Sequence, residues 1–189
     1  MKFDKLFGTV VLLMTDPIRA WRYFGRKSSY KGMLVDFLYP MMLLVCIAVF
    51  LGTLFGYSFD AERIYPAVIN MIVSFVTILC SYHLISFLVA RITPRFVGAE
   101  PQRHCTDKLT CYSMSVVLVI EFFLALFPNF RIIAWIAQFY TVKIVWDGVE
   151  VLLPVPENKR LAYTMAVSMM ILILPVIIGR SLSVISLNL

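Results

Sequence analysis

Five long apolar runs, separated by short polar segments, constrain the fold of this chain more than any other feature of its sequence. Each run is close to the ~20 residues that an α-helix needs to cross a bilayer. They cover residues 33–55, 64–90, 109–127, 131–153 and 161–180. Only 15% of the residues are charged, against roughly 25% in soluble domains. The short alternating segments of a membrane β-barrel are absent from the sequence. The sequence therefore predicts an all-α, polytopic transmembrane bundle of five spans.

The N-terminal residues 1–31 predict an amphipathic segment at the membrane interface, ahead of a transmembrane domain at 32–189. Thr15-Asp16-Pro17 divides this segment into two predicted helices, with Asp16 as the cap and Pro17 in the first turn of the second. In the first helix, apolar residues recur at the spacing of an interfacial helix. They are Phe3, Leu6, Phe7, Val10 and Met14.

The second predicted helix combines an aromatic residue with basic ones. Trp21 lies among Arg19, Arg22 and Arg26, and such a mixture suits the lipid headgroup layer. These four residues are predicted to anchor the segment at the membrane interface. The alternative is a cytosolic lid that packs on the bundle.

The fourth run is apolar but carries Lys143, Asp147 and Glu150. A charge at the centre of a transmembrane helix costs about 2.5–3.5 kcal/mol on insertion scales. Together with Tyr140 these residues occur at i, i+3, i+7 and i+10, which forms one stripe on a helix. Such a stripe should face other helices or a wet groove, and Lys143 and Asp147 are spaced to pair.

Two further carboxylates lie inside predicted spans. Asp36 is ~5 Å from the start of the first span, so it can reach water. We expect Asp36 and the stripe to line a cytoplasm-facing groove for a ligand or a lipid headgroup. Glu121 is roughly 9 Å from the far end of the third span. As an intramembrane carboxylate with no charged neighbour on its own helix, Glu121 should be neutral or paired across helices.

The distribution of basic residues predicts the orientation in the membrane. With the N-terminus in the cytoplasm, 14 of the 17 Lys and Arg residues fall in cytoplasmic segments or reach toward them. These segments include the predicted loop at 91–108 and the turn that follows Pro154 and Pro156. The positive-inside rule then places the C-terminus outside. Because the charges cluster at the ends of apolar runs, the net charge of +6 does not indicate nucleic-acid binding.

Motifs for catalysis or cofactor binding are missing from the sequence. It contains no Gly-rich phosphate loop, nucleophile elbow or paired-histidine zinc motif. An intramembrane aspartate dyad would require Asp36 and Asp147, and this reading is disfavoured. Cys105 and Cys111 lie near His104, but the remaining ligand spacing of a zinc site is missing, so packing and loop roles are favoured over metal binding. We therefore expect no enzyme activity, no cofactor and no metal.

Four segments together resemble the Yip family (Ypt-interacting protein) of five-span membrane proteins, especially its bacterial members. They are TDPIRAWRYF (15–24), VDFLYPMMLLV (35–45), TPRFVGAEPQRHCTDKLTCYSMS (93–115) and FYTVKIVWDGVEVLLPVPENKRLAYTMAV (139–167). The segment PRFVGAE departs from the Gly-Gly pair that the family often has. The resemblance implies a bacterial cytoplasmic-membrane protein without a catalytic residue set. Eukaryotic relatives are associated with Rab-type GTPases, but no residue here is tied to that role.

Two functional hypotheses follow from these features. The first is a non-enzymatic membrane protein that organises membrane lipids or partner proteins through the polar groove. The second is a small transporter or channel for an ion or a lipid, which uses the stripe of the fourth span. A third reading makes the stripe an interhelical network with no traffic through it. Membrane lipids are the expected partners, a second membrane-associated protein and an oligomer are left open, and nucleic acid is not expected.

Overall fold

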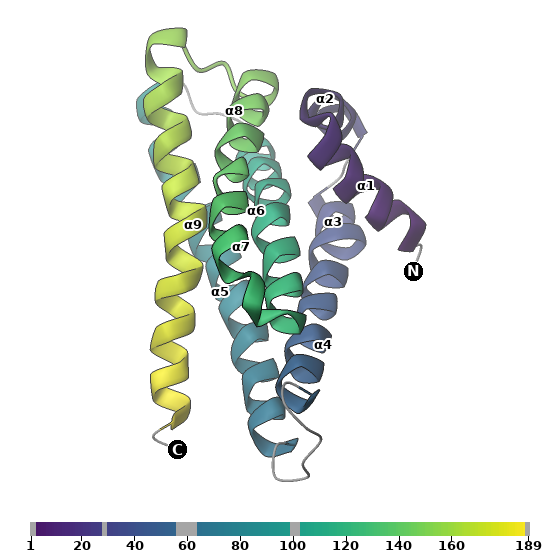
Figure 1. The fold of residues 1–189 in the computed structure, drawn as a ribbon. Helices are drawn as coiled ribbons and strands as arrows, with labels where there is room; N and C mark the ends of the chain where they lie inside the picture. Colours follow the sequence, from purple (N-terminus) through teal and green to yellow (C-terminus); the bar gives the residue numbers. More distant parts are fainter. Residues whose placement is uncertain (1–2, 28–29, 56–63, 99–102, 188–189) are drawn as a thin grey trace.

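The computed structural model describes residues 3–27, 30–55, 64–98 and 103–187. Within these ranges the chain is helical and contains no β-strand. Segments long and apolar enough to cross a membrane lie at Leu34–Phe55, Ile64–Val97, Arg103–Leu126, Pro128–Leu152 and Glu157–Ile185. They run roughly along one direction as a bundle (Figure 1). The predicted all-α polytopic bundle with five spans is confirmed.

The N-terminal segment forms two helices, α1 (Phe3–Thr15) and α2 (Pro17–Lys27). Asp16 separates them, and the Arg19 backbone N–H donates a hydrogen bond to Asp16 Oδ1 at 3.2 Å. This is the predicted N-cap, with Pro17 opening the helix. Figure 1 shows α2 at the end of the bundle where α8 finishes and α9 begins.

The first span begins with a wide turn. After α3 (Tyr30–Met33), residues Leu34–Leu38 form a π-helical turn, and α4 (Tyr39–Phe55) completes the span. Pro40 has no amide hydrogen for the carbonyl four residues earlier, so regular α-helical bonding is interrupted here. The Tyr39 N–H instead bonds to the carbonyl of Leu34.

The predicted loop at 91–108 is wrong for the described part of that range. The second span, α5 (Ile64–Val97), continues through Pro94, and the third, α6 (Arg103–Leu126), begins before Leu109. A proline removes a single N–H from the ladder, and the helix instead ends at Val97, immediately before Gly98, which has a φ of 73°. Glycine adopts this left-handed conformation without a steric penalty.

The last two spans lie where the sequence predicted them, but their first and last residues differ from the predicted ones. A short 3-10 turn (Pro128–Phe130) leads into α7 (Arg131–Gln138) and then α8 (Tyr140–Leu152), with an interruption at Phe139 that the sequence did not predict. Residues 153–156 are non-helical, as expected from Pro154 and Pro156. The fifth span, α9 (Glu157–Leu187), extends beyond the predicted 161–180 at both ends.

The third span is the centre of the bundle. Helix α6 packs against both α4 and α8, and it also contacts α5. Its residues 109–118 are all buried. Helix α9 packs on α5 and α8, while α2 packs on α8. The position of α6 decides which parts of the other spans can meet.

Candidate functional site

The stripe on α8 contains an ion pair. Lys143 Nζ donates to Asp147 Oδ2 at 2.9 Å, which is the pairing that the spacing predicted. The side chain of Asp147 is only 8% exposed, whereas that of Lys143 is 55% exposed. The carboxylate is therefore enclosed by the bundle, and the ammonium group reaches outward over it.

The two ends of the stripe connect α8 to other helices. The Tyr140 hydroxyl donates to the carbonyl of Met14, at the end of α1, at 2.8 Å. Glu150 forms an ion pair with Arg160 of α9, with Oε2 and NH1 3.6 Å apart. The Arg160 guanidinium also lies 5.9 Å from the centre of the Trp146 ring. The stripe thus joins α1, α8 and α9.

Asp36, which we expected in the same groove, lies elsewhere. It is an exposed residue of the π-helical turn, beside Gly32 of α3. Because α6 packs between α4 and α8, the first and fourth spans are kept apart. No ion pair within the described ranges includes Asp36. The structure therefore supplies the polar face of α8 without the Asp36 side of the predicted groove.

Trp21 was assigned to the membrane interface, but the structure places its side chain inside the bundle. The indole is fully buried, and its Nε1–H donates to the carbonyl of Ile144 on α8 at 3.0 Å. Gly148 makes room for it, since a Cβ there would lie 2.7 Å from the Trp21 ring. The sequence signal was the glycine within the charged span, which indicates close approach of another group.

The basic residues of α2 remain on the outside. The Arg19 side chain is 81% exposed and forms an ion pair with Asp16, with the two side chains 3.1 Å apart. Arg22 is also exposed, and the side chain of Arg26 lies outside the described residues. Lys108 of α6 donates to the carbonyls of Phe24 and Gly25, both at 3.3 Å. A cation at these carbonyls stabilises the C-terminal end of α2, a role that sequence reasoning missed.

Helix α1 has apolar residues on two sides rather than one. Leu6 and Leu13 are buried against the bundle, while Phe7 and Val11 are 60% and 56% exposed. One side of α1 therefore packs on protein and the other faces outward. An outward apolar side suits contact with the lipid interface.

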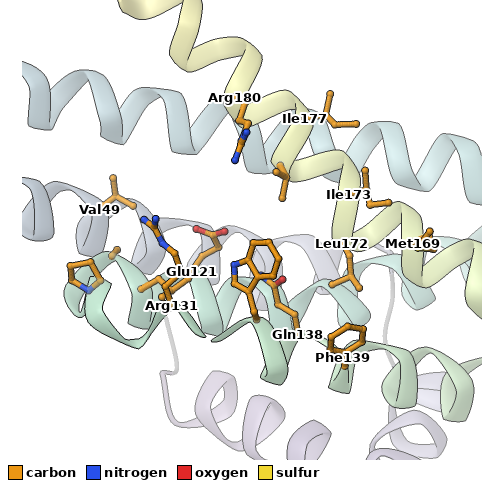
Figure 2. A pocket seen from close by; sticks show the side chains of 15 residues that line it. Val49, Glu121, Arg131, Gln138, Phe139, Met169, Leu172, Ile173, Ile177 and Arg180 are labelled. Carbon is orange, nitrogen blue, oxygen red and sulfur yellow. The ribbon is translucent and has the colours of Figure 1, made fainter. Parts of the chain in front are cut away.

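The remaining candidates lie apart from α8. Glu121 is exposed on α6, at a groove between α7 and α9 (Figure 2). Cys111 is buried and Cys105 partly buried. In the described part of the chain, no three His, Cys, Asp or Glu residues gather in a way that would hold a metal ion.

The Lys143–Asp147 pair predicts non-additive effects on stability. Removing one member of a buried pair costs about 3–5 kcal/mol, whereas removing both is often tolerated. Because Lys143 is half exposed, we expect Asp147→Leu to cost less than Lys143→Met, which leaves a buried carboxylate alone. The double variant should unfold less readily in detergent than Lys143→Met.

The matched control for this cycle is the pair of Glu150 and Arg160, in which the carboxylate side chain is 53% exposed. Glu150→Gln should change the free energy of unfolding by at most about 1 kcal/mol. Losses that simply add in the double variant would show that Lys143 and Asp147 do not stabilise each other.

Five apolar helices, with an amphipathic helix docked at one end, define a polytopic integral membrane protein. The family model described as the Yip1 domain matches residues 11–178, and the chain belongs to this family. No curated protein and no solved structure gives a match to the chain.

Proposed function

We propose that this Yip1-domain protein is a non-enzymatic membrane protein that gathers anionic lipids at the end of the bundle that carries α2. The observation that supports this is the way in which α2 is docked. Its apolar side, with Trp21, is occupied by protein, so its basic side is held in a fixed position. Each basic residue near an anionic membrane surface contributes about 1 kcal/mol of attraction.

The polar stripe of α8 has a supporting role in this proposal. Its charged groups are engaged by Lys143–Asp147 and Glu150–Arg160, and Tyr140 holds the end of α1. These contacts favour an interhelical network that fixes α1 and α9 relative to α8. They favour this structural role over an ion path along α8, because a path needs polar groups that are free to bind ions and release them.

The test measures enrichment of anionic lipid around the protein in vesicles of phosphatidylcholine with a minority of phosphatidylglycerol. Arg19→Gln combined with Arg22→Gln should remove about 2 kcal/mol of attraction, roughly a 30-fold loss at low salt. The loss should shrink at high salt because exposed charges are screened.

The matched control is the double change Arg19→Lys and Arg22→Lys, which preserves the charge and should retain the enrichment. Equal enrichment for the glutamine variant and the wild type would overturn the lipid proposal. If the glutamine variant lost a bound protein instead, α2 would be a protein-docking surface.

We further propose that the α2 end faces the cytoplasm of a bacterial cell, with the membrane being the cytoplasmic one. Support comes from the charges: exposed Arg19, Arg22, Arg91 and Arg95 lie on helices that reach this end. The positive-inside rule favours such a side as cytoplasmic.

Cysteine labelling of intact cells tests this orientation. In a background with the four native cysteines replaced, Asn129→Cys should react with a membrane-impermeant maleimide, because the turn after α6 would lie outside. Asn158→Cys, at the start of α9, should react only after permeabilisation. Both asparagines are exposed, so the opposite labelling pattern would reverse the orientation.

A further inference from the structure

A groove of about 800 Å³ runs between α7 and α9, with α6 at its base. Most of its lining is apolar and includes Phe139, Met169, Leu172 and Ile173. Met169 and Ile173 are 57% and 43% exposed. The groove therefore presents apolar side chains from α7 and α9, with Phe139, Met169, Leu172 and Ile173 along its walls (Figure 2).

Charged side chains gather at one end of this groove. Arg131 begins α7, Arg180 comes from α9 and Glu121 comes from α6. Figure 2 shows Arg180 reaching from α9 towards the side of the groove that carries Arg131 and Glu121. Within the described residues, none of the three forms an ion pair. Because these side chains are not engaged in protein ion pairs, this end of the groove suits a ligand that carries both signs of charge.

The distance between two arginines of α9 matches the thickness of the hydrocarbon layer of a bilayer. Arg160 and Arg180 are twenty residues apart on α9, which is about 30 Å at 1.5 Å per residue. This equals the ~30 Å thickness of the hydrocarbon layer. If Arg160 marks one boundary, Arg180 marks the other.

The apolar part of the groove matches the length of one leaflet. From Arg180 back to Met169 the wall covers eleven residues of α9, or about 16 Å. Half of the hydrocarbon layer is about 15 Å. The groove thus has a charged end at headgroup level and an apolar wall as deep as an acyl chain.

We propose that this groove binds one phospholipid with an ethanolamine headgroup, drawn from the leaflet opposite to α2. The phosphate lies between Arg131 and Arg180, which can both donate charge-assisted hydrogen bonds to it. The ammonium group donates to the Glu121 carboxylate, and an acyl chain lies along Met169, Leu172 and Ile173. The two arginines then share the phosphate, and Glu121 faces the ammonium group, so each charged side chain meets a lipid group of opposite sign.

The proposed site is independent of the lipid-gathering role of α2, because the two occupy opposite ends of the bundle. Arg19 and Arg22 are not part of the groove. Variants of one site leave the other intact, so failure of either proposal is recognised separately.

The experiment titrates the full-length protein in detergent with phosphatidylethanolamine and counts bound lipid by native mass spectrometry. We expect one tightly held lipid per chain. Arg131→Gln and Arg180→Gln should each weaken binding by about tenfold, the loss expected for a hydrogen bond to a charged group. Arg95→Gln, an exposed arginine on α5 outside the groove, is the matched control and should bind normally.

Two more variants separate the headgroup from the tail. Glu121→Gln should remove the preference for phosphatidylethanolamine over phosphatidylcholine, because a choline group has no N–H to donate. Ile173→Trp should fill the space beside the apolar wall and weaken the binding of the lipid. The binding of soluble phosphoethanolamine, which has no acyl chain, should be unchanged. Circular dichroism confirms that each variant is folded.

Three results would overturn the proposal. One is equal lipid binding by the wild type and the folded variant with both arginines replaced. Another is soluble phosphoethanolamine binding as tightly as the lipid, which would make the tail wall irrelevant. The third is a change in the oligomeric state of the groove variants while the amount of bound lipid stays the same. That result would make the groove a contact between copies of the chain.

Discussion

Replacement of Trp21 with alanine is expected to destabilise the protein by about 3–5 kcal/mol, the usual range for a buried tryptophan. The indole is fully buried, and its Nε1–H donates to the carbonyl of Ile144. It also meets the Tyr112 ring edge-on, with ring centres 5.9 Å apart. Loss of these contacts should free α2 from α8. Thermal unfolding in detergent measures the stability, and faster hydrogen exchange across 17–27 reports the release of α2.

Trp135→Ala is the matched control for this change. Trp135 lies on α7 and is 67% exposed, so its removal should alter the free energy of unfolding by no more than about 0.5 kcal/mol. Trp21→Phe keeps much of the apolar volume and removes the hydrogen bond, so an intermediate loss is expected. Equal effects of Trp21→Ala and Trp135→Ala would show that α2 is not docked through Trp21.

Gly52→Ala is expected to destabilise the bundle by about 3 kcal/mol, the upper part of the range for overpacking. A Cβ at Gly52 of α4 would collide with the backbone carbonyl of Ala125 on α6. A backbone group cannot rotate away as the end of a side chain can, so α4 and α6 would have to separate. Small residues allow this kind of close approach between membrane helices.

The control for Gly52 is Gly8→Ala on α1, where a Cβ meets nothing within 4 Å. Alanine is favoured over glycine in an open helical position by roughly 0.5–1 kcal/mol. The two substitutions should therefore have opposite signs in the same unfolding assay. A stabilising effect at both positions would contradict the close approach of α4 and α6.

The docking of α2 links these stability predictions to the proposed function. Trp21 fastens α2 to Ile144 of α8, and Lys108 of α6 binds the carbonyls near the end of α2. The conformational entropy of the helix is thus lost on folding rather than on contact with lipid. We therefore expect Trp21→Ala to weaken the enrichment of anionic lipid even though Arg19 and Arg22 are unchanged.

Hydrophobicity alone predicted the number and order of the spans, because a membrane helix must be apolar over about 20 residues. The same signal misplaced the ends of α5, α6 and α9. Apolar runs report which residues lie in hydrocarbon, whereas helices continue into polar sequence. The end of α5, just before Gly98, depended on the left-handed backbone conformation of that glycine, which the apolar pattern does not contain.

Helical spacing also predicted the local chemistry of α8. Lys143 and Asp147 are one turn apart on the same helix, so their pairing needs no knowledge of other spans. The Asp16 cap is local in the same way. Interactions within one turn of a helix follow from the order of residues, and the sequence alone was sufficient for both.

Contacts between helices were decided only by the tertiary structure. Asp36 and the α8 stripe were expected to share a groove, but α6 packs between their spans. Trp21 looked like a membrane anchor because its sequence neighbours are basic, yet Gly148, more than a hundred residues away, provides the space that buries it. Periodicity tells which residues share one helical face. Which helix meets that face depends on the packing of the whole bundle.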